Sequence, residues 1–244
     1  MALTSVVIKQ VAKRYGMVRA VANVSLTLNA GSVCALLGHN GAGKTTLLGM
    51  LSTLVTPSAG TITYLDGATP MPQTNQLRRE IGLLAHASLC YADLTAEENL
   101  YLFAELYGLP ASAATVAAML DEVGLAKAAR QRPAKTYSRG MVQRLALARA
   151  LLPGPSLVLL DEPFTGLDRG GAMALGQTIA KLKARGAIVV VITHDLEAIA
   201  ETTNHVCILR RGALAHEVRT AEDAAGYSYT ALKDLYHAHG EAAA

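Results

Sequence analysis

The residues from 38 to 45 constrain this chain more than any other part of its sequence. They fit the pattern G-x-x-x-x-G-K-[ST], in which glycines let a loop curl until its backbone N–H groups point inward at phosphate oxygens. A strand-length apolar run, Ser32–Leu37, precedes the pattern, and a helical pattern follows it through Leu54. The positive N-terminal end of that helix would face the phosphates. The pattern therefore predicts a phosphate-binding loop made of Gly38, His39, Asn40, Gly41, Ala42, Gly43, Lys44 and Thr45.

Three side chains at the end of this loop have expected roles toward a nucleoside triphosphate. Lys44 is expected to neutralise the β- and γ-phosphates, and Thr45 to place its hydroxyl on Mg²⁺. Thr46 can add a further phosphate contact. The alternative is a glycine-rich turn with an incidental lysine, and the position of the pattern between a strand and a helix argues against it.

Two acidic residues follow a short apolar run in the second half of the chain. Leu157–Leu160 reads as a buried strand that would deliver Asp161 beside the phosphate loop, where it can hold Mg²⁺ through water. Glu162 lies one residue further, points to the other side, and is placed to accept a proton from an attacking water as a general base. In the alternative interpretation, both acids only mark the end of a strand. The presence of the phosphate loop makes this alternative the weaker one.

Composition and length limit the class of protein. The 244 residues suffice for one or two compact domains, and 51% hydrophobic with 17% charged residues is typical of a globular α/β chain. No apolar run approaches the roughly 20 residues needed to cross a bilayer, and the N-terminus does not resemble a signal peptide. A net charge of +3 is too small to indicate nucleic acid or an anionic membrane surface. We expect a cytosolic chain that associates with a membrane only through a partner.

Cysteine and histidine positions predict no metal centre. Cys34, Cys90 and Cys207 are scattered along the chain and lack the spacing of metal ligands, so reduced thiols are expected. The seven histidines likewise show no ligand set in the sequence.

Strand-like and helix-like segments alternate on both sides of a helical stretch. Buried strands that alternate with helices indicate a mostly parallel sheet with ligands at the strand C-terminal ends. Thr95 and Glu98 form a capping-box pattern at the start of one helix. The expected strands are Val6–Val11, Val24–Leu28, Ser32–Leu37, Gly60–Gly67, Ile81–Ala85, Leu157–Leu160, Ala187–Thr193, Val206–Leu209 and Ala213–Val218; the expected helices are Asn99–Tyr107, Ala111–Val123, Ser138–Leu152, Gly171–Arg185 and Asp195–Thr203, with a frayed tail over His237–Ala244.

The remaining motifs resemble those of ATP-binding cassettes (ABC proteins), in order and at similar spacing along nearly the whole chain. Ser138, Arg139, Gly140 and Met141 occupy the place of the family signature LSGGQ, where Arg139 replaces a glycine and Met141 replaces the glutamine. The resemblance implies that this helix start binds the γ-phosphate of ATP held by a second subunit. Ser138 also suits a simple helix N-cap, which is the structural alternative.

Three further positions match the family. Tyr15 precedes the phosphate loop, where these proteins place an aromatic ring against adenine, although packing is an equal alternative. Asp168 ends a stretch that resembles the family's D-loop at the dimer seam. His194 follows an expected strand, where the family carries a histidine that contacts the γ-phosphate, and we assign it a catalytic role with Glu162.

The resemblance implies the fold and the activity. The expected fold is α/β, a P-loop nucleotide hydrolase core with a mixed sheet, an N-terminal antiparallel β part and an inserted all-helical subdomain. One ABC ATPase domain would span 1–244, with 1–86 and 151–244 as the nucleotide-binding core and 87–150 as the helical insert that carries the signature. The expected activity is ATP hydrolysis with ATP and Mg²⁺, and the expected partners are integral membrane transporter subunits and a second copy of the chain. The protein would lie on the inner face of the cell membrane.

His86 departs from the family, which mostly carries a metal-sensing glutamine there, and we expect His86 to face Mg²⁺. The stretch Gly82–His86 and the variant signature resemble the haem exporter ATPase of cytochrome c maturation (CcmA type). That resemblance implies haem export as the cargo system, without direct haem binding by this chain. The alternatives are an ATPase of another exporter, for a drug, lipid or polysaccharide, and a soluble ABC ATPase outside transport. Soluble members usually carry two cassettes or a long coiled coil, and this chain shows neither.

Overall fold

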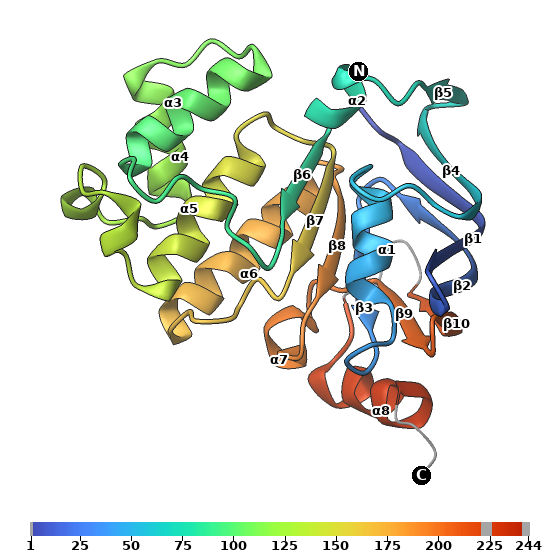
Figure 1. Ribbon diagram of the computed structural model, residues 1–244. Helices are drawn as coiled ribbons and strands as arrows, with labels where there is room; N and C mark the ends of the chain where they lie inside the picture. The colour runs from blue at the N-terminus through green and yellow to red at the C-terminus, as the bar shows by residue number, and fades with distance from the viewer. Residues whose placement is uncertain (1, 221–225, 241–244) are drawn as a thin grey trace.

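The computed structural model describes residues 2–220 and 226–240, and the chain folds around two β-sheets (Figure 1). The larger sheet contains β3 (Val33–Leu37), β6 (Ile81–Leu84), β7 (Leu157–Asp161), β8 (Ile188–Ile192), β9 (His205–Arg210) and β10 (Ala213–Arg219). Its strand order is β10-β9-β3-β8-β7-β6. Every neighbouring pair is parallel except β9 and β10, which form an antiparallel hairpin. The predicted mixed sheet is therefore present, with its parallel strand ends on one edge.

The smaller sheet is antiparallel and comes mainly from the N-terminal part of the chain. It contains β1 (Ser5–Tyr15), β2 (Val18–Asn29), β4 (Ala59–Asp66) and β5 (Thr69–Met71), in the order β2-β1-β4-β5. The helices are α1 (Lys44–Leu51), α2 (Asn75–Arg79), α3 (Ala96–Tyr107), α4 (Ala113–Glu122), α5 (Arg139–Leu151), α6 (Arg169–Ala184), α7 (Leu196–Ile199) and α8 (Tyr229–Gly240).

The strands β3, β7 and β8 of the larger sheet are buried along their whole length, although successive residues of a strand point to opposite sides, so both faces of the sheet are covered there. Val158 and Leu160 of β7 belong to an apolar core that also receives side chains from α3 to α6. Leu157 and Leu159 enter a second core, which contains residues of α1 and of the smaller sheet. This two-sided burial explains why β7 reads as a continuous apolar run in the sequence.

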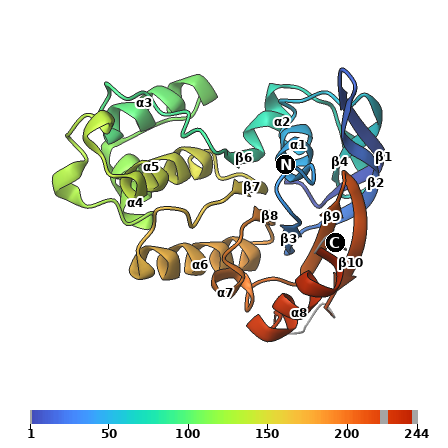
Figure 2. The ribbon, with the colours of Figure 1, turned by 60° about the horizontal axis from the view of Figure 1, so that its bottom comes forward.

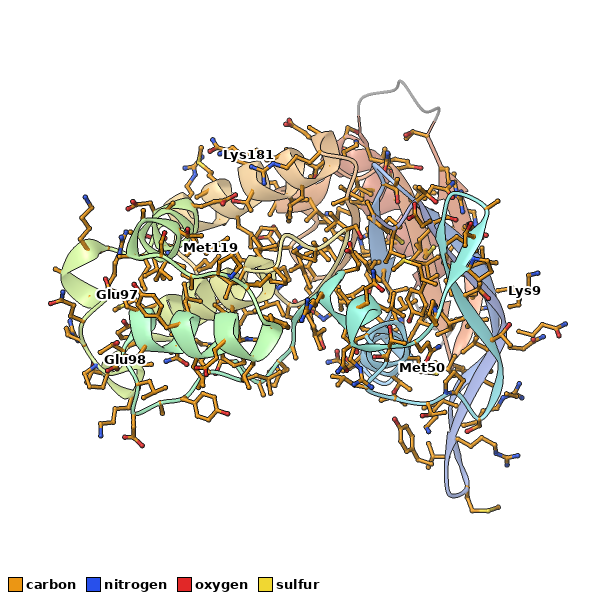
Figure 3. All side chains as sticks on the ribbon, turned by 90° about the horizontal axis from the view of Figure 1, so that it is seen from above. Lys9, Met50, Glu97, Glu98, Met119 and Lys181 are labelled. Atoms are coloured by element: carbon orange, nitrogen blue, oxygen red, sulfur yellow. The ribbon has the colours of Figure 1, made fainter. Side chains whose placement is uncertain are left out.

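The two outer parts lie on opposite sides of the larger sheet. Figure 2 shows α3, α4 and α5 together at one side and β1, β2 and β4 at the other. In Figure 3, Lys9 of β1 and Glu97 of α3 mark the two extremes, and Met50 of α1 lies between them. Among the described residues, no helix is both long and apolar enough to cross a bilayer.

Side-chain oxygens cap the starts of five helices, α3 to α7. The predicted capping box is confirmed, because the Thr95 hydroxyl accepts the N–H of Glu98 and the Glu98 side chain reaches back to the Thr95 N–H. The helix α3 therefore begins at Ala96, earlier than the Asn99 predicted. Ser138 and Asp168 cap α5 and α6 with their side-chain oxygens.

Several predicted boundaries are wrong for physical reasons. The strands β1 and β2 extend well beyond Val6–Val11 and Val24–Leu28, since their polar ends pair with each other in a long hairpin up to Tyr15 and Val18. The helix predicted from Asp195 to Thr203 contains only α7, a single turn.

The tail was also predicted wrongly in part. His237 belongs to α8, whose residues Leu232, Leu235, Tyr236 and His239 share one face at helical spacing. Leu232 is fully buried, and Tyr236 packs against the core that contains Val158 and Leu160, so tertiary packing stabilises this helix. Residues 241–244 of the predicted tail lie outside the described residues.

Candidate active site

The phosphate loop joins the end of β3 to the start of α1, at the edge where the parallel strands end. Two of its glycines are required by close contacts. Gly38 has a φ of 141°, and a Cβ at this position would lie 2.3 Å from the carbonyl oxygen of Leu209. Gly43 has a φ of 100°, and a Cβ there would lie 2.3 Å from the carbonyl oxygen of Ala20. The loop is thus packed against β9 on one side and β2 on the other, which fixes its curl.

Lys44 lies at the base of this loop and is 8% exposed. Its ammonium donates hydrogen bonds to the carbonyl oxygens of Gly38, at 2.6 Å, and His39, at 3.0 Å. Burial lowers the pKa of Lys44, while the nearby carboxylates of Glu162 and Asp161 act in the opposite direction. A buried cation enclosed by the phosphate loop is suited to the negative charge of a triphosphate.

Thr45 and Asp161 bring two oxygen ligands together from different parts of the chain. The Thr45 hydroxyl donates to Oδ2 of Asp161 at 3.1 Å, so the first turn of α1 touches the end of β7. Mg²⁺ prefers hydroxyl, carboxylate and water oxygens. The residues present therefore fit the ion that the sequence predicts at this place.

Glu162 follows Asp161 directly, but its carboxylate faces a different neighbour. It accepts the backbone N–H of His194 at 3.4 Å, and its other oxygen lies 3.3 Å from Nε2 of the His194 ring. Its φ of 50° lies in the left-handed region, which is unusual for a non-glycine residue, and the chain turns there at the end of β7. Burial raises the pKa of Glu162, against the lowering effects of His194 and Lys44. A raised carboxyl pKa makes the carboxylate a better proton acceptor.

Two clefts meet at Glu162. One, of about 400 Å³, is lined by Asn40 of the phosphate loop together with Glu162, Thr165 and His194. The other, of about 170 Å³, is lined by His86, Arg139, Gln143, Asp161 and Glu162, among other residues. The structure thus brings His86 into the same cleft as the predicted metal ligand Asp161.

Gln143 is a cleft residue that the sequence did not single out. Its side-chain amide donates to the carbonyl oxygen of Pro163 at 3.1 Å, which ties α5 to the segment after Glu162. The sequence signal that could have identified Gln143 was its position, two residues beyond the signature in the first turns of the expected helix.

Three of the four signature residues lie in a third cleft, whereas Arg139 lines the cleft of Asp161 and Glu162. Ser138, Gly140 and Met141 line a cavity of about 540 Å³ together with Asp168, and none of its described lining residues belongs to the phosphate loop. A Cβ on Gly140 would lie 2.7 Å from the carbonyl oxygen of Gly166, so the helix start packs tightly on its own D-loop. Within one chain, the structure does not bring the signature and the phosphate loop together.

Tyr15 lies at the exposed end of the β1–β2 hairpin and is 50% exposed. The Lys13 ammonium lies 5.2 Å from the centre of its ring. Because Ala20 of β2 contacts Gly43, this hairpin borders the phosphate loop. The ring is therefore accessible near the loop.

A phosphate loop between a buried strand and a helix, a threonine hydroxyl on a strand-end aspartate and an adjacent half-buried glutamate define a P-loop nucleoside triphosphatase. Comparison with known proteins narrows this class, since a family model described as ABC transporter matches residues 21–165. The chain belongs to the ABC transporter family.

Relatives and solved structures agree with this assignment. The ABC transporter ATP-binding protein NatA of Bacillus subtilis is 35% identical over 82% of this chain and 82% of its own length. The Nod factor export ATP-binding protein I of Burkholderia orbicola is 35% identical over 87% of this chain and 70% of its own length. A dimeric ATP-binding cassette in a post-hydrolysis state with ADP and Pi is 27% identical, with a TM-score of 0.80 over 88% of this chain and 98% of its own. The predicted α/β P-loop fold is confirmed, and the protein is an ATP hydrolase, the ATP-binding subunit of an ABC transporter.

Proposed function

We propose that two copies of this chain hydrolyse ATP with Mg²⁺ at their shared interface and so power export by membrane subunits, with haem export for cytochrome c biogenesis as the cargo system. The observation that carries the two-copy arrangement is the separation of the signature cleft from the phosphate loop within one chain. Phosphate bound by Ser138, Gly140 and Met141 would therefore come from a second copy. The solved relative with ADP and Pi is described as dimeric.

In this arrangement each residue of the phosphate loop region has a defined task. The amides from Gly38 to Thr45 and the ammonium of Lys44 bind the phosphates, and Thr46 adds a contact. The hydroxyl of Thr45 and the carboxylate of Asp161 hold Mg²⁺, which supplies charge neutralisation to the phosphates. Tyr15 stacks on the base. Across the interface, Ser138, Arg139, Gly140 and Met141 face the γ-phosphate, and Asp168 caps α6 at the seam.

Glu162 and His194 act on the nucleophile. The carboxylate of Glu162 accepts a proton from the attacking water, and His194, at 3.3 Å, holds that carboxylate in place and contacts the γ-phosphate. His86 lines the cleft of Asp161 and Glu162 and would contact Mg²⁺ or its water there. Through this contact His86 would connect the metal site to the helical insert.

The division of the chain supports the same mechanism. We propose that residues 1–86 and 151–244 form the nucleotide-binding core and that residues 87–150 form a helical insert that contacts the membrane subunits. The chain would then lie in the cytoplasm, on the inner face of the membrane, and would not bind haem itself.

Two cargo systems have specific support. Gly82–His86 and the Ser-Arg-Gly-Met signature favour the CcmA-type haem exporter, because both departures from the common pattern coincide there. A different exporter is favoured by the names of relatives, such as the Nod factor export protein. Both alternatives share export as the direction of transport.

Isolation of the native membrane complex with a tagged chain separates these systems. We expect integral membrane subunits that co-purify with haem or with a haem-binding chaperone. Membrane subunits free of haem, whose ATPase activity responds to a drug or an oligosaccharide, would contradict the haem assignment. Recovery of the chain without any membrane protein would contradict its role in transport.

A further inference from the structure

Three metal-ligating side chains meet inside the protein, away from the phosphate loop. The Sγ atoms of Cys34 and Cys207 and a ring nitrogen of His205 all lie within 4.8 Å of one another. Nε2 of His205 lies 3.3 Å from Sγ of Cys207. The sequence predicted no such set, because Cys34 and Cys207 stand at opposite ends of the chain.

Strand pairing explains why the three side chains meet. The parallel neighbours β3 and β9 place Cys34 opposite His205 in the sheet register. His205 and Cys207 are two residues apart on one strand, so both side chains point to the same face. The two strands lie side by side in Figures 1 and 2. The cluster is thus built by the regular sheet rather than by a mobile loop.

The cluster is almost completely withdrawn from water. Cys34 is 1% exposed, His205 2% and Cys207 0%. Both cysteines belong to the core between the larger sheet and the antiparallel sheet. A polar histidine in such a place needs a partner, because an unsatisfied buried polar group is costly.

Glu217 of the hairpin strand β10 supplies an oxygen at the edge of this cluster. Its Oε1 lies 3.0 Å from Nε2 of His205 and 2.9 Å from Nη2 of Arg219. The Arg219 guanidinium also donates to the carbonyl oxygen of Thr27 on β2. Glu217 is partly exposed, so it lies between the buried side chains of the cluster and the protein surface.

We propose that Cys34, His205 and Cys207 form a structural site for a thiophilic divalent ion of the zinc class, and that Glu217, whose carboxylate contacts only His205 of the three, moves in from the edge as the fourth ligand. Two sulfurs, one imidazole nitrogen and one carboxylate oxygen are a tetrahedral ligand set for Zn²⁺. Zinc–ligand bonds of about 2.0–2.3 Å place neighbouring ligand atoms roughly 3.5 Å apart in a tetrahedron. The 3.3 Å between His205 and Cys207 matches that separation.

Charge balance also fits a divalent ion. Binding releases one proton from each thiol, and the two thiolates then neutralise the ion. The Glu217 carboxylate is balanced by the Arg219 guanidinium beside it. A buried ion whose charge is neutralised by its ligands avoids the cost of an uncompensated charge in the core.

Such an ion would clamp two strands that support the phosphate loop. The loop begins directly after β3, and Gly38 packs against the carbonyl of Leu209 on β9. Joining β3 to β9 by a metal would therefore stabilise the fold around the loop without contacting the nucleotide. Because only the folded chain assembles the four ligands, binding should raise the melting temperature.

The test uses the full chain, purified with a reductant and stripped of metal, and measured in excess Mg²⁺ so that the oxygen donors of Thr45 and Asp161 are occupied. Zn²⁺ is titrated against a chromophoric chelator, and Co²⁺ serves as an optical probe. We expect one ion per chain, an intense thiolate-to-Co²⁺ charge-transfer band and a higher melting temperature with Zn²⁺.

Variants assign the ligands. Cys207→Ser leaves only the Cys34 thiolate and should strongly reduce the charge-transfer band, and Glu217→Gln should weaken Zn²⁺ binding by about 10- to 100-fold. Cys90→Ser is the matched control, since Cys90 lies outside the cluster, and it should bind like the wild type.

Cys207→Ser alters a core side chain and can disturb folding. The spectrum of the wild-type protein and the binding by Glu217→Gln, at a partly exposed position, therefore test the proposal independently of that variant. Wild-type protein that binds neither ion tightly would overturn it. Unchanged affinity in Glu217→Gln, or loss of binding in Cys90→Ser, would also contradict the assigned ligands. A disulfide between Cys34 and Cys207 in protein isolated without reductant would show that the cysteines serve a redox function instead.

Discussion

The carboxylate of Glu162 lies 3.3 Å from Nε2 of His194, and its second oxygen accepts the backbone N–H of the same histidine. The two residues follow β7 and β8, which are parallel neighbours whose C-terminal ends meet at one edge of the sheet. Two strand ends therefore place a base and a histidine together beside the cleft lined by Asn40 of the phosphate loop.

The first prediction concerns Glu162 as the general base. Glu162→Gln removes the proton acceptor but keeps the shape of the side chain, so ATP turnover should fall by about 100- to 10,000-fold while ATP binding persists. Uncleaved ATP should then hold two copies together, which light scattering with MgATP can measure. The control is Glu105→Gln on the exposed face of α3, which should leave turnover unchanged. Normal turnover in Glu162→Gln would exclude this residue as the base.

A second prediction follows from the raised pKa of Glu162. Burial raises the carboxyl pKa in the folded state above its value in the unfolded chain, so the fold favours the protonated form. That contribution is fully present below the unfolded pKa and is lost as the pH rises through the folded pKa. At neutral pH the ionised side chain therefore destabilises the fold, and Glu162→Gln should raise the melting temperature.

Scanning calorimetry across pH measures this effect. The difference in melting temperature between Glu162→Gln and the wild type should grow from mildly acidic to neutral pH. A difference that is constant with pH, or a less stable variant at neutral pH, would be inconsistent with a carboxyl pKa raised by burial.

His86 provides a third prediction, because it lines the cleft of Asp161 and Glu162. An imidazole nitrogen that contacts Mg²⁺ or its water contributes to metal binding, so His86→Gln should change the Mg²⁺ concentration needed for half-maximal turnover. The measurement is ATPase activity across Mg²⁺ concentration for both proteins. Superimposable curves would remove His86 from the metal site.

The capping box of α3 gives a stability prediction. Thr95→Ala leaves the N–H of Glu98 without its hydroxyl acceptor, and the protein should lose about 1 kcal/mol of unfolding free energy. Thr95→Ser retains the oxygen and should lose little. Denaturant unfolding of the two variants checks this, and an equal loss in both would show that the methyl group, rather than the cap, stabilises the helix.

Local patterns in the sequence predicted the parts of the site that depend on neighbours in the chain. The phosphate loop, the Asp161–Glu162 strand end and the capping box are short segments whose chemistry and geometry are fixed within a few residues. Parallel strands that end at one edge then explain why Thr45 and Asp161 meet.

The features that the sequence did not predict depend on contacts between distant segments. The helix α8 is apolar only on the side of Leu232, and it is stable because that side packs on the core that contains Val158 and Leu160. Gln143 enters the site because of the path of α5. Cys34 and Cys207 come together only once β9 pairs with β3, since no spacing along the chain encodes a register between strands.

The central claim is that ATP binds between the phosphate loop of one chain and the signature of another, and mixed variants test it directly. Lys44→Ala disables the phosphate loop and leaves the signature intact. Ser138→Asp repels the triphosphate, yet an aspartate still caps α5. Each variant alone should be inactive, and an equimolar mixture should recover part of the wild-type turnover, because a mixed pair contains one complete site. If the mixture stays as inactive as its components while each variant remains folded, ATP is not shared between two chains.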